Sequence, residues 1–195
     1  MNKIGIIGIG MLGNAVALHL LDVGFQVTIF NRTKEKAIQL KEKGAIIATS
    51  PKEVAIKSEL IIIIVKDANA VKEISFESNG ITEGAHDGLI VADMSTIDPL
   101  ESKQISERFL KNNINKLDIP VMGGPNVAIS GELVMMVSGD KKSFEQCRNI
   151  LEKIANKIFF LGDNGAAHSI KLAMNLQITM LALALSEGIM LVEKT

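Results

Sequence analysis

The sequence predicts a doubly wound α/β fold of Rossmann type, with a mostly parallel sheet followed by the start of a long helix. Strand-like and helix-like patterns alternate along most of the 195 residues, and a glycine-rich turn separates the first strand from the first helix. Leu60–Val65 is a continuous, mostly β-branched run, typical of a strand buried on both faces. We expect a first domain over residues 1–162. The helix over residues 163–195 would begin an all-α domain.

The elements follow one another in a regular order. Strands are expected at Lys3–Ile7, Gln26–Phe30, Ala45–Ile47, Leu60–Val65, Leu89–Ala92, Ile114–Ile119, Leu133–Val137 and Lys157–Leu161. Helices are expected after the glycine-rich turn, from Ser50, at Ala68–Ile74, Asp98–Leu110 and Lys142–Ile154, and from about Asn164. Ser50, Pro51 and Glu53 predict a helix start with a capping box.

The glycine-rich turn predicts a dinucleotide-binding site. Its residues fit the pattern G-x-G-x-x-G through Gly8, Gly10 and Gly13, with Met11 and Leu12 between the last two. The first glycine permits a tight turn, the second lets the backbone approach a pyrophosphate, and the third allows close packing of helix and strand. The amides at the start of the helix would then bind the pyrophosphate. A glycine-rich turn without a ligand is the alternative.

The end of the second strand indicates which nicotinamide cofactor is preferred. An acidic residue is expected there in an NAD enzyme, but this chain has Asn31, Arg32 and Thr33. Asn carries no charge to repel a 2′-phosphate, and Arg offers a planar fork of donors for one. NADP(H) is therefore favoured, with NAD(H) as the alternative. Thr33 could equally cap a helix starting at Lys34, and Lys34 and Lys36 could form a solvated face.

Composition favours a soluble enzyme and disfavours several other classes. Hydrophobic residues make up 47% of the chain, enough for a sizeable core, whereas a net charge of −1 and 4% aromatic residues argue against a nucleic-acid surface. Cys147 is the sole cysteine, so we expect a buried, inert thiol in a reducing compartment, the cytoplasm. The first 20 residues lack a signal-peptide layout, and Ile61–Val65 is too short to span a membrane. The three histidines are widely spaced and predict no metal site.

Polar residues follow several strand ends, where ligands bind in such folds. Ser95 and Thr96 come after one strand, and Gly123 and Gly124 after another. Exposed amides of a Gly-Gly pair suit an anion, although a plain turn is the alternative. Ser95 could instead cap the following segment.

The long helix carries Lys171 and Asn175, whose spacing places both on one face. Apolar neighbours would desolvate the lysine and lower its pKa toward the range useful for proton transfer. An ordinary surface lysine is the alternative. His168 is expected to be exposed.

The chain resembles the β-hydroxyacid dehydrogenases, which include 3-hydroxyisobutyrate dehydrogenase, tartronate semialdehyde reductase and glyoxylate/succinic semialdehyde reductases, and have a 6-phosphogluconate dehydrogenase-like NAD-binding domain. The stretches that carry the resemblance run over almost the whole chain and are GIGMLG, NRT, DMST, LDIPVMGGP and GDNGAAHSIKLAMN. The resemblance implies Lys171 as general acid/base and Asn175 as a substrate ligand. It also implies that Ser95, with the amides near Gly123 and Gly124, holds a substrate carboxylate.

The resemblance further implies cofactor contacts for Thr96 and for the turn formed by Val65 and Lys66. The chain departs from the family pattern at two positions. Met122 stands where the family usually has Ser, so the pocket would be more apolar there. Lys66 stands where family members often have a Pro after the fourth strand, and its charge could contact a cofactor phosphate or face solvent.

The family resemblance also sets expectations about length and assembly. Family members are longer, with an all-helical second half that closes the active site and builds the dimer. The chain stops in a helical pattern without a stop signal, so we expect a fragment or a short form. Apolar residues on several faces of this helix predict a homodimer through it: Leu176, Ile178, Met180, Leu181, Leu183, Leu185, Ile189, Met190 and Leu191.

The sequence is compatible with three functions. The leading one is an NADP(H)-dependent oxidoreductase acting on a small carboxylate-bearing 3-hydroxy acid, semialdehyde or glyoxylate-like substrate. The second is a module that binds the cofactor without efficient turnover. The third is an imine reductase, against which Lys171 argues, because that related class generally lacks a lysine there.

Overall fold

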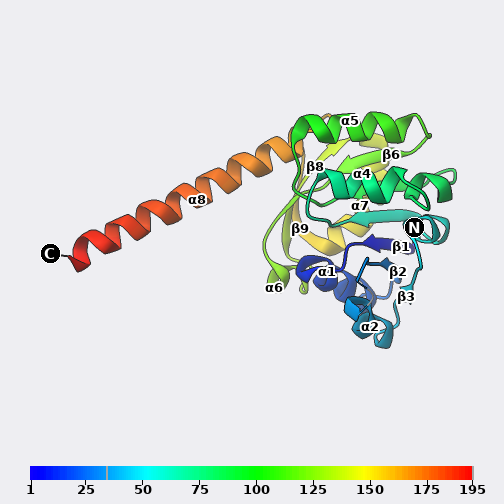
Figure 1. Ribbon diagram of the computed structural model, residues 1–195, viewed down its shortest axis with the longest axis horizontal. Helices are drawn as coiled ribbons and strands as arrows, with labels where there is room; N and C mark the ends of the chain where they lie inside the picture. Colours follow the sequence, from blue (N-terminus) through cyan, green and yellow to red (C-terminus); the bar gives the residue numbers. More distant parts are fainter. Residues whose placement is uncertain (34, 195) are drawn as a thin grey trace.

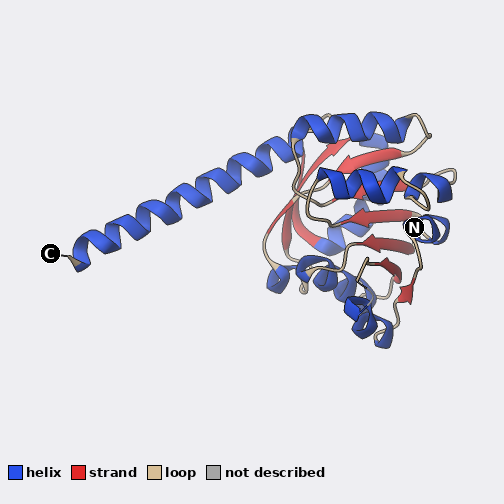
Figure 2. Ribbon diagram, viewed as in Figure 1, coloured by secondary structure: helices blue, strands red, loops and turns tan. Residues whose placement is uncertain are grey.

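The computed structural model describes residues 1–33 and 35–194, and only the backbone of Lys36. Within these residues, nine strands form one sheet in the order β3-β2-β1-β4-β5-β6-β8-β7, with β9 paired to β8 (Figures 1 and 2). The first six strands are parallel, as a doubly wound fold requires. The predicted fold class is therefore confirmed.

The observed strands are β1 (Lys3–Ile7), β2 (Gln26–Phe30), β3 (Ile46–Ile47), β4 (Leu60–Ile63), β5 (Ile90–Asp93), β6 (Asn115–Asp118), β7 (Val121–Met122), β8 (Leu133–Gly139) and β9 (Ala155–Phe160). The helices are α1 (Met11–Asp22), α2 (Glu35–Glu42), α3 (Pro51–Lys57), α4 (Ala68–Phe76), the 3₁₀ turn η1 (Ile81–Gly84), α5 (Pro99–Leu110), α6 (Pro125–Ala128), α7 (Lys141–Ile154) and α8 (Ala166–Glu193). The predicted start of α2 at Lys34 lies outside the described residues.

The region between β6 and β8 differs most from expectation. The short β7 and α6 were not predicted, and β8 runs antiparallel to β6. The chain between β6 and β8 forms β7, which pairs antiparallel with β8, in place of a helical crossover that would return the chain in parallel. β9 then pairs with β8 in parallel, so both strands oppose the first six.

The start of α3 is a modified capping box. The hydroxyl of Ser50 accepts a hydrogen bond of 3.2 Å from the amide of Glu53, as predicted. The carboxylate of Glu53 does not return to the amide of Ser50. It accepts bonds of 2.7 Å from both the amide and the hydroxyl of Thr49, which fixes the chain one residue earlier.

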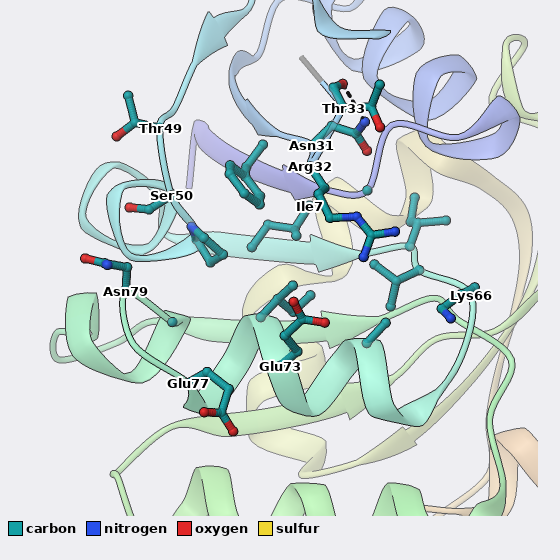
Figure 3. A pocket seen from close by; sticks show the side chains of 18 of the residues that line it. Ile7, Asn31, Arg32, Thr33, Thr49, Ser50, Lys66, Glu73, Glu77 and Asn79 are labelled. Carbon is teal, nitrogen blue, oxygen red and sulfur yellow. Dashed lines mark hydrogen bonds between the residues drawn. The ribbon is translucent and has the colours of Figure 1, made fainter. Parts of the chain in front are cut away.

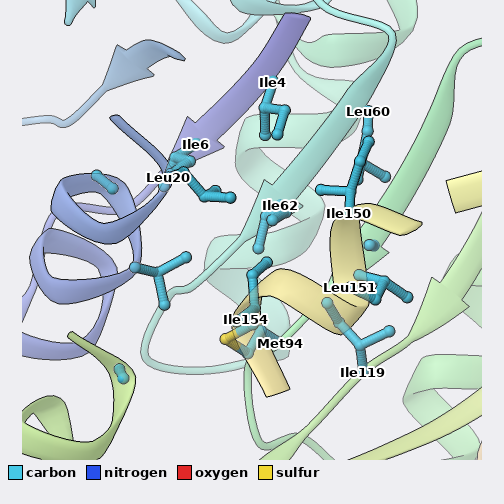
Figure 4. Close-up of a cluster of buried hydrophobic side chains, with 14 of the residues drawn as sticks. Ile4, Ile6, Leu20, Leu60, Ile62, Met94, Ile119, Ile150, Leu151 and Ile154 are labelled. Carbon is cyan, nitrogen blue, oxygen red and sulfur yellow. The ribbon is translucent and has the colours of Figure 1, made fainter. Parts of the chain in front are cut away.

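Two buried clusters cover the two faces of the sheet. The larger combines one face of β1 and β4 with α1 and α7, including Leu20, Ile62, Ile150 and Ile154 (Figure 4). The other packs α3, α4 and α5 against the opposite face. Cys147 is buried in the larger cluster, and burial raises the pKa of its thiol to about 12, as expected of an inert cysteine.

The last helix, α8, projects away from the α/β body (Figure 1). Of its described residues only Ala167 and His168 are buried, and apolar side chains are exposed along its length. By length and composition α8 would also suffice to cross a membrane. One helix of this kind does not distinguish a membrane span from a helix that packs against protein.

Candidate cofactor and substrate sites

A cleft of about 580 Å³ lies beyond the carboxyl ends of β1, β2 and β4. Many of the predicted cofactor residues line it: Gly8, Gly10, Asn31, Arg32, Thr33, Val65 and Lys66. Met11, Leu12 and Gly13 follow Gly10 in the first turn of α1 and are exposed, half-buried and buried in that order. The structure therefore brings together residues that are far apart in the sequence, at the edge where doubly wound folds bind ligands.

The glycine-rich turn has the shape that a pyrophosphate requires. Gly8 has a φ of +103°, and a Cβ at Gly8 would lie 2.0 Å from the carbonyl oxygen of Ile64. A Cβ at Gly10 would instead meet open space, so the chain presents bare backbone toward the cleft there. Gly10 is the N-cap of α1 and provides no side-chain hydrogen bond. The first helical hydrogen bond runs from the amide of Asn14 to the carbonyl of Gly10. The preceding amides of the first turn are thus available for an anion.

Asn31 braces the glycine-rich turn from the end of β2. Its Oδ1 accepts a hydrogen bond of 2.9 Å from the amide of Ile9, and its Nδ2 donates one of 2.8 Å to the carbonyl of Thr33. Arg32 is exposed, and its guanidinium reaches into the cleft across from Glu73 (Figure 3). The end of β2 therefore presents a neutral bracing amide and a guanidinium to the cleft, with the carboxylate of Glu73 opposite.

The turn after β4 connects the cleft to the loop after β5. Val65 lines the cleft, and its amide donates a hydrogen bond of 3.0 Å to the hydroxyl of Ser95. Lys66 is exposed, and its amino group forms an ion pair with the carboxylate of Asp67 at 3.1 Å. Ser95 is buried, whereas Thr96 is exposed. The hydroxyl of Ser95 therefore anchors the Val65 turn and does not cap the segment after β5.

Lys171 lies on the second turn of α8. Its Nζ is 3.1 Å from the Sδ of Met122 at the end of β7. Burial lowers the pKa of Lys171, as the apolar surroundings predict. Asn175 is half-buried one turn further along the same helix. Gly123, with a φ of +116°, and Gly124 follow Met122 directly, so the lysine faces the strand end that carries the Gly-Gly pair.

His168 contradicts the expectation of an exposed side chain. It is fully buried, with its Nε2 3.6 Å from an oxygen of Asp118. Asp118 and Lys116 of β6 and Asp93 of β5 are buried beside it. Burial alone would raise the pKa of Asp118, but Lys116, His168 and the amide of Gly165 together lower it well below its usual range. The first turn of α8 is therefore fixed on charged groups, which explains why this histidine is not at the surface.

With this geometry in place, comparison with known proteins identifies the family. Residues 3–162 match the model of the NAD-binding domain of 6-phosphogluconate dehydrogenase. An uncharacterized oxidoreductase of Bacillus subtilis is 34% identical over 98% of the chain and 67% of its own length. Glyoxylate/succinic semialdehyde reductase 1 of Arabidopsis thaliana is 33% identical over 99% of the chain and 67% of its own length. The chain belongs to the β-hydroxyacid dehydrogenase family.

A solved structure agrees with this assignment. A 3-hydroxyisobutyrate dehydrogenase of Mycobacterium tuberculosis, described with L-serine, superposes with a TM-score of 0.92 and 25% identity, over 100% of this chain and 66% of the other. This β-hydroxyacid dehydrogenase family member thus has a nicotinamide dinucleotide-binding domain and spans about two thirds of the length of these relatives.

Sequence reasoning missed two groups of residues. Thr49, Ser50, Glu73, Glu77 and Asn79 also line the cleft. The buried charges at the ends of β5 and β6 were not given a role. Asp93 and Asp118 end neighbouring buried strands and are partners in the parallel register. Two acidic residues that end adjacent buried strands, one of which also contains Lys116, are the signal that could have drawn attention to this cluster.

Proposed function

We propose that this family member is an NADP(H)-dependent oxidoreductase that interconverts a small carboxylate-bearing aldehyde and its hydroxy acid. The observation that carries the proposal is the position of Lys171, half-buried against Met122 next to the Gly-Gly pair, in a protein that also has a dinucleotide cleft beyond β1, β2 and β4. A half-buried lysine with a lowered pKa suits proton transfer to a substrate oxygen.

NADPH bound in the cleft would supply the hydride that reduction of the aldehyde carbon requires. The ammonium of Lys171 gives a proton to the aldehyde oxygen, which completes the alcohol, and in the oxidative direction the neutral amine takes that proton back. Asn175 would hydrogen-bond the substrate from the same helix face. Ser95 and the amides near Gly123 and Gly124 would hold the carboxylate, and Thr96, with the Val65 turn and Lys66, would contact the cofactor.

We also propose a preference for NADP(H). Arg32 reaches into the cleft from the strand end that faces the adenosine ribose in such folds, and Asn31 beside it is neutral. The first-turn amides of α1, from Met11 to Gly13, would bind the pyrophosphate.

We propose further that α8 pairs with the α8 of a second copy. Its exposed apolar side chains need a covering surface, while the buried His168 at its start keeps this end on the α/β body. We favour a protein partner over a membrane because Lys171 and Asn175 occupy the same helix. Sedimentation at micromolar concentration should give a dimer, and a stable, well-behaved monomer would refute this assembly.

The function is tested by a reductase assay with NADPH and glyoxylate, succinic semialdehyde, tartronate semialdehyde and methylmalonate semialdehyde. Lys171→Ala should lower kcat by about 100-fold or more while NADPH binding is retained. The exposed Lys157→Ala is the matched control and should keep full activity. NADPH binding without turnover of any substrate would favour the binding module instead, and full activity in Lys171→Ala would refute the acid/base role.

A further inference from the structure

A cluster of buried charges lies between the loop after β5 and the start of α8. Its members are Asp93 of β5, Lys116 and Asp118 of β6, and His168 of α8, and none of their side chains is exposed to solvent. The proposed reaction uses none of them directly. Their contacts nevertheless form a continuous path between the two segments that carry Ser95 and Lys171.

The path begins at the loop after β5. The Oδ1 of Asp93 accepts a hydrogen bond of 3.0 Å from the amide of Ser95 and so fixes the backbone that carries the Ser95 hydroxyl. The other carboxylate oxygen of Asp93 lies 3.6 Å from the Nζ of Lys116. Lys116 is therefore in electrostatic contact with the group that shapes this loop.

The path continues from Lys116 to α8. The ammonium of Lys116 forms a short ion pair with Asp118 and donates a hydrogen bond of 2.9 Å to the hydroxyl of Ser102. Asp118 in turn accepts a bond of 2.6 Å from the amide of Gly165, the residue that caps α8. Ser138 links the same carboxylate, at 3.0 Å, to the amide of Ala167, at 3.1 Å. Both amides belong to the beginning of the helix that carries Lys171.

Stability alone does not require charges at these positions. Well-packed hydrophobic residues of similar volume often replace a buried ion cluster without loss of stability, because removing charges from water is costly. Hydrogen bonds between charged groups are directional, unlike hydrophobic contacts, so each one fixes the position of one atom relative to another. Here the fixed atoms are backbone amides of the two segments that would form opposite sides of the substrate site.

We propose that Asp93, Lys116 and Asp118 are positioning residues that couple the Ser95 loop to the start of α8. The coupling holds the carboxylate-binding loop and Lys171 in one geometry. Its catalytic consequence rests on the proposed function, whereas the mechanical coupling does not. A small displacement of a catalytic group suffices to lower a rate strongly, so loosening either end should reduce turnover at saturating substrate.

The coupling is tested by hydrogen exchange in Asp93→Asn. The amide cannot attract Lys116 as the carboxylate does, although its oxygen can still accept the bond from Ser95. Hydrogen exchange of the backbone amides in residues 163–171 should therefore become about tenfold faster. Since the described contacts of Asp93 reach α8 only through Lys116, such an effect would have to pass along the proposed path. Val54→Ala, in α3 on the opposite face of the sheet, is the control for a general loss of stability.

Ser138→Ala is a milder second variant that loosens only the link between Asp118 and α8. Because coupling is reciprocal, it should raise exchange in residues 93–96 as well as at Ala167. Exchange in 163–171 that rises no more in Asp93→Asn than in Val54→Ala would overturn the proposal. So would an effect of Ser138→Ala confined to α8.

A kinetic measurement separates this proposal from the function. In active wild-type protein, Asp93→Asn should lower kcat about tenfold and raise KM for the aldehyde, with an unchanged Kd for NADPH. Val54→Ala should change neither kcat nor KM. An inactive wild type would refute the proposed function and leave the exchange measurement to decide the coupling. An active wild type with unaltered kcat in folded Asp93→Asn would refute the positioning role.

Discussion

The amino group of Lys171 and the sulfur of Met122 lie 3.1 Å apart, although 49 residues separate them in the chain. A thioether is a weak acceptor, so it holds the ammonium far less firmly than a hydroxyl or carboxylate would. A substrate oxygen can therefore replace it at low cost. The same side chain leaves the proposed pocket more apolar than the Ser that the family usually has at this position.

Met122→Ser should shift substrate preference toward hydroxylated aldehydes. The new hydroxyl can hydrogen-bond a polar substituent, so kcat/KM for tartronate semialdehyde relative to succinic semialdehyde should rise about tenfold. Met122→Leu is the matched control because it keeps the pocket apolar, and its preference should equal that of the wild type. Equal ratios in all three proteins would show that Met122 does not contact the substrate.

Sequence periodicity predicted the sheet well because β1 and β4 are buried on both faces and bounded by clear turns. The glycine-rich turn and the end of β2 also lie where local chemistry predicts. Periodicity could not predict the reversal of β8, since this strand is buried along most of its length and so has the same continuous pattern as the parallel strands. Local sequence reasoning also placed His168 in solvent, because the charged residues that surround it lie on strands 50 or more residues earlier in the chain. Spatial relationships of this kind depend on register, which one sequence does not reveal.

Arg32→Ala should weaken NADPH binding selectively. Loss of a guanidinium from a 2′-phosphate site should raise the Kd for NADPH by about tenfold or more, because a charge-assisted contact is lost, and leave the Kd for NADH nearly unchanged. Titration of each cofactor by fluorescence measures both constants. The control is Lys43→Ala, which removes an exposed positive charge outside the cleft and should alter neither value. An equal rise of both Kd values in Arg32→Ala would show that the guanidinium does not bind the 2′-phosphate.

The reaction should depend on pH with opposite signs in its two directions. Burial lowers the pKa of Lys171, so its proton is lost at a lower pH than that of an ordinary lysine. Reduction needs the ammonium, and kcat should fall as pH rises through this pKa. Oxidation needs the neutral amine, and kcat should rise over the same interval. Profiles in both directions at saturating cofactor measure this. Parallel profiles, or alkaline limbs only above the pKa of a free lysine, would argue against Lys171 as the proton donor.

Acid should remove the stability that Asp118 contributes. Its pKa is far below the ordinary value, so the folded state favours the carboxylate. The contribution of Asp118 to the free energy of unfolding is complete above its pKa in the unfolded chain, about 3.9. It is lost as pH falls toward the lower pKa of Asp118 in the folded protein. At pH 7, Asp118→Asn should cost about 3–5 kcal/mol, because Lys116 would lose its partner. Urea denaturation should show this difference narrowing below about pH 4.

Glu53→Gln provides the control for the acid measurement. The pKa of Glu53 is about 2, lowered first by its hydrogen bond with Lys57 and then by Thr49, but this carboxylate is close to the surface. Solvent screening should keep its effect on unfolding to about 1 kcal/mol or less. A difference between Asp118→Asn and wild type that stays constant down to pH 3 would mean that Asp118 is not held ionised by Lys116.

Cys147 should resist alkylation until the protein opens. Burial raises the pKa of its thiol to about 12, so little thiolate forms at pH 8, and the side chain has no exposed surface. Iodoacetamide at pH 8 should leave the folded protein unmodified and label it once in denaturing urea, since the chain has a single cysteine. In intermediate urea the labelling rate should follow the population of unfolded protein, measured in parallel by circular dichroism. Rapid labelling while the circular dichroism signal remains native would instead reveal a local opening of α7, the helix that carries this residue.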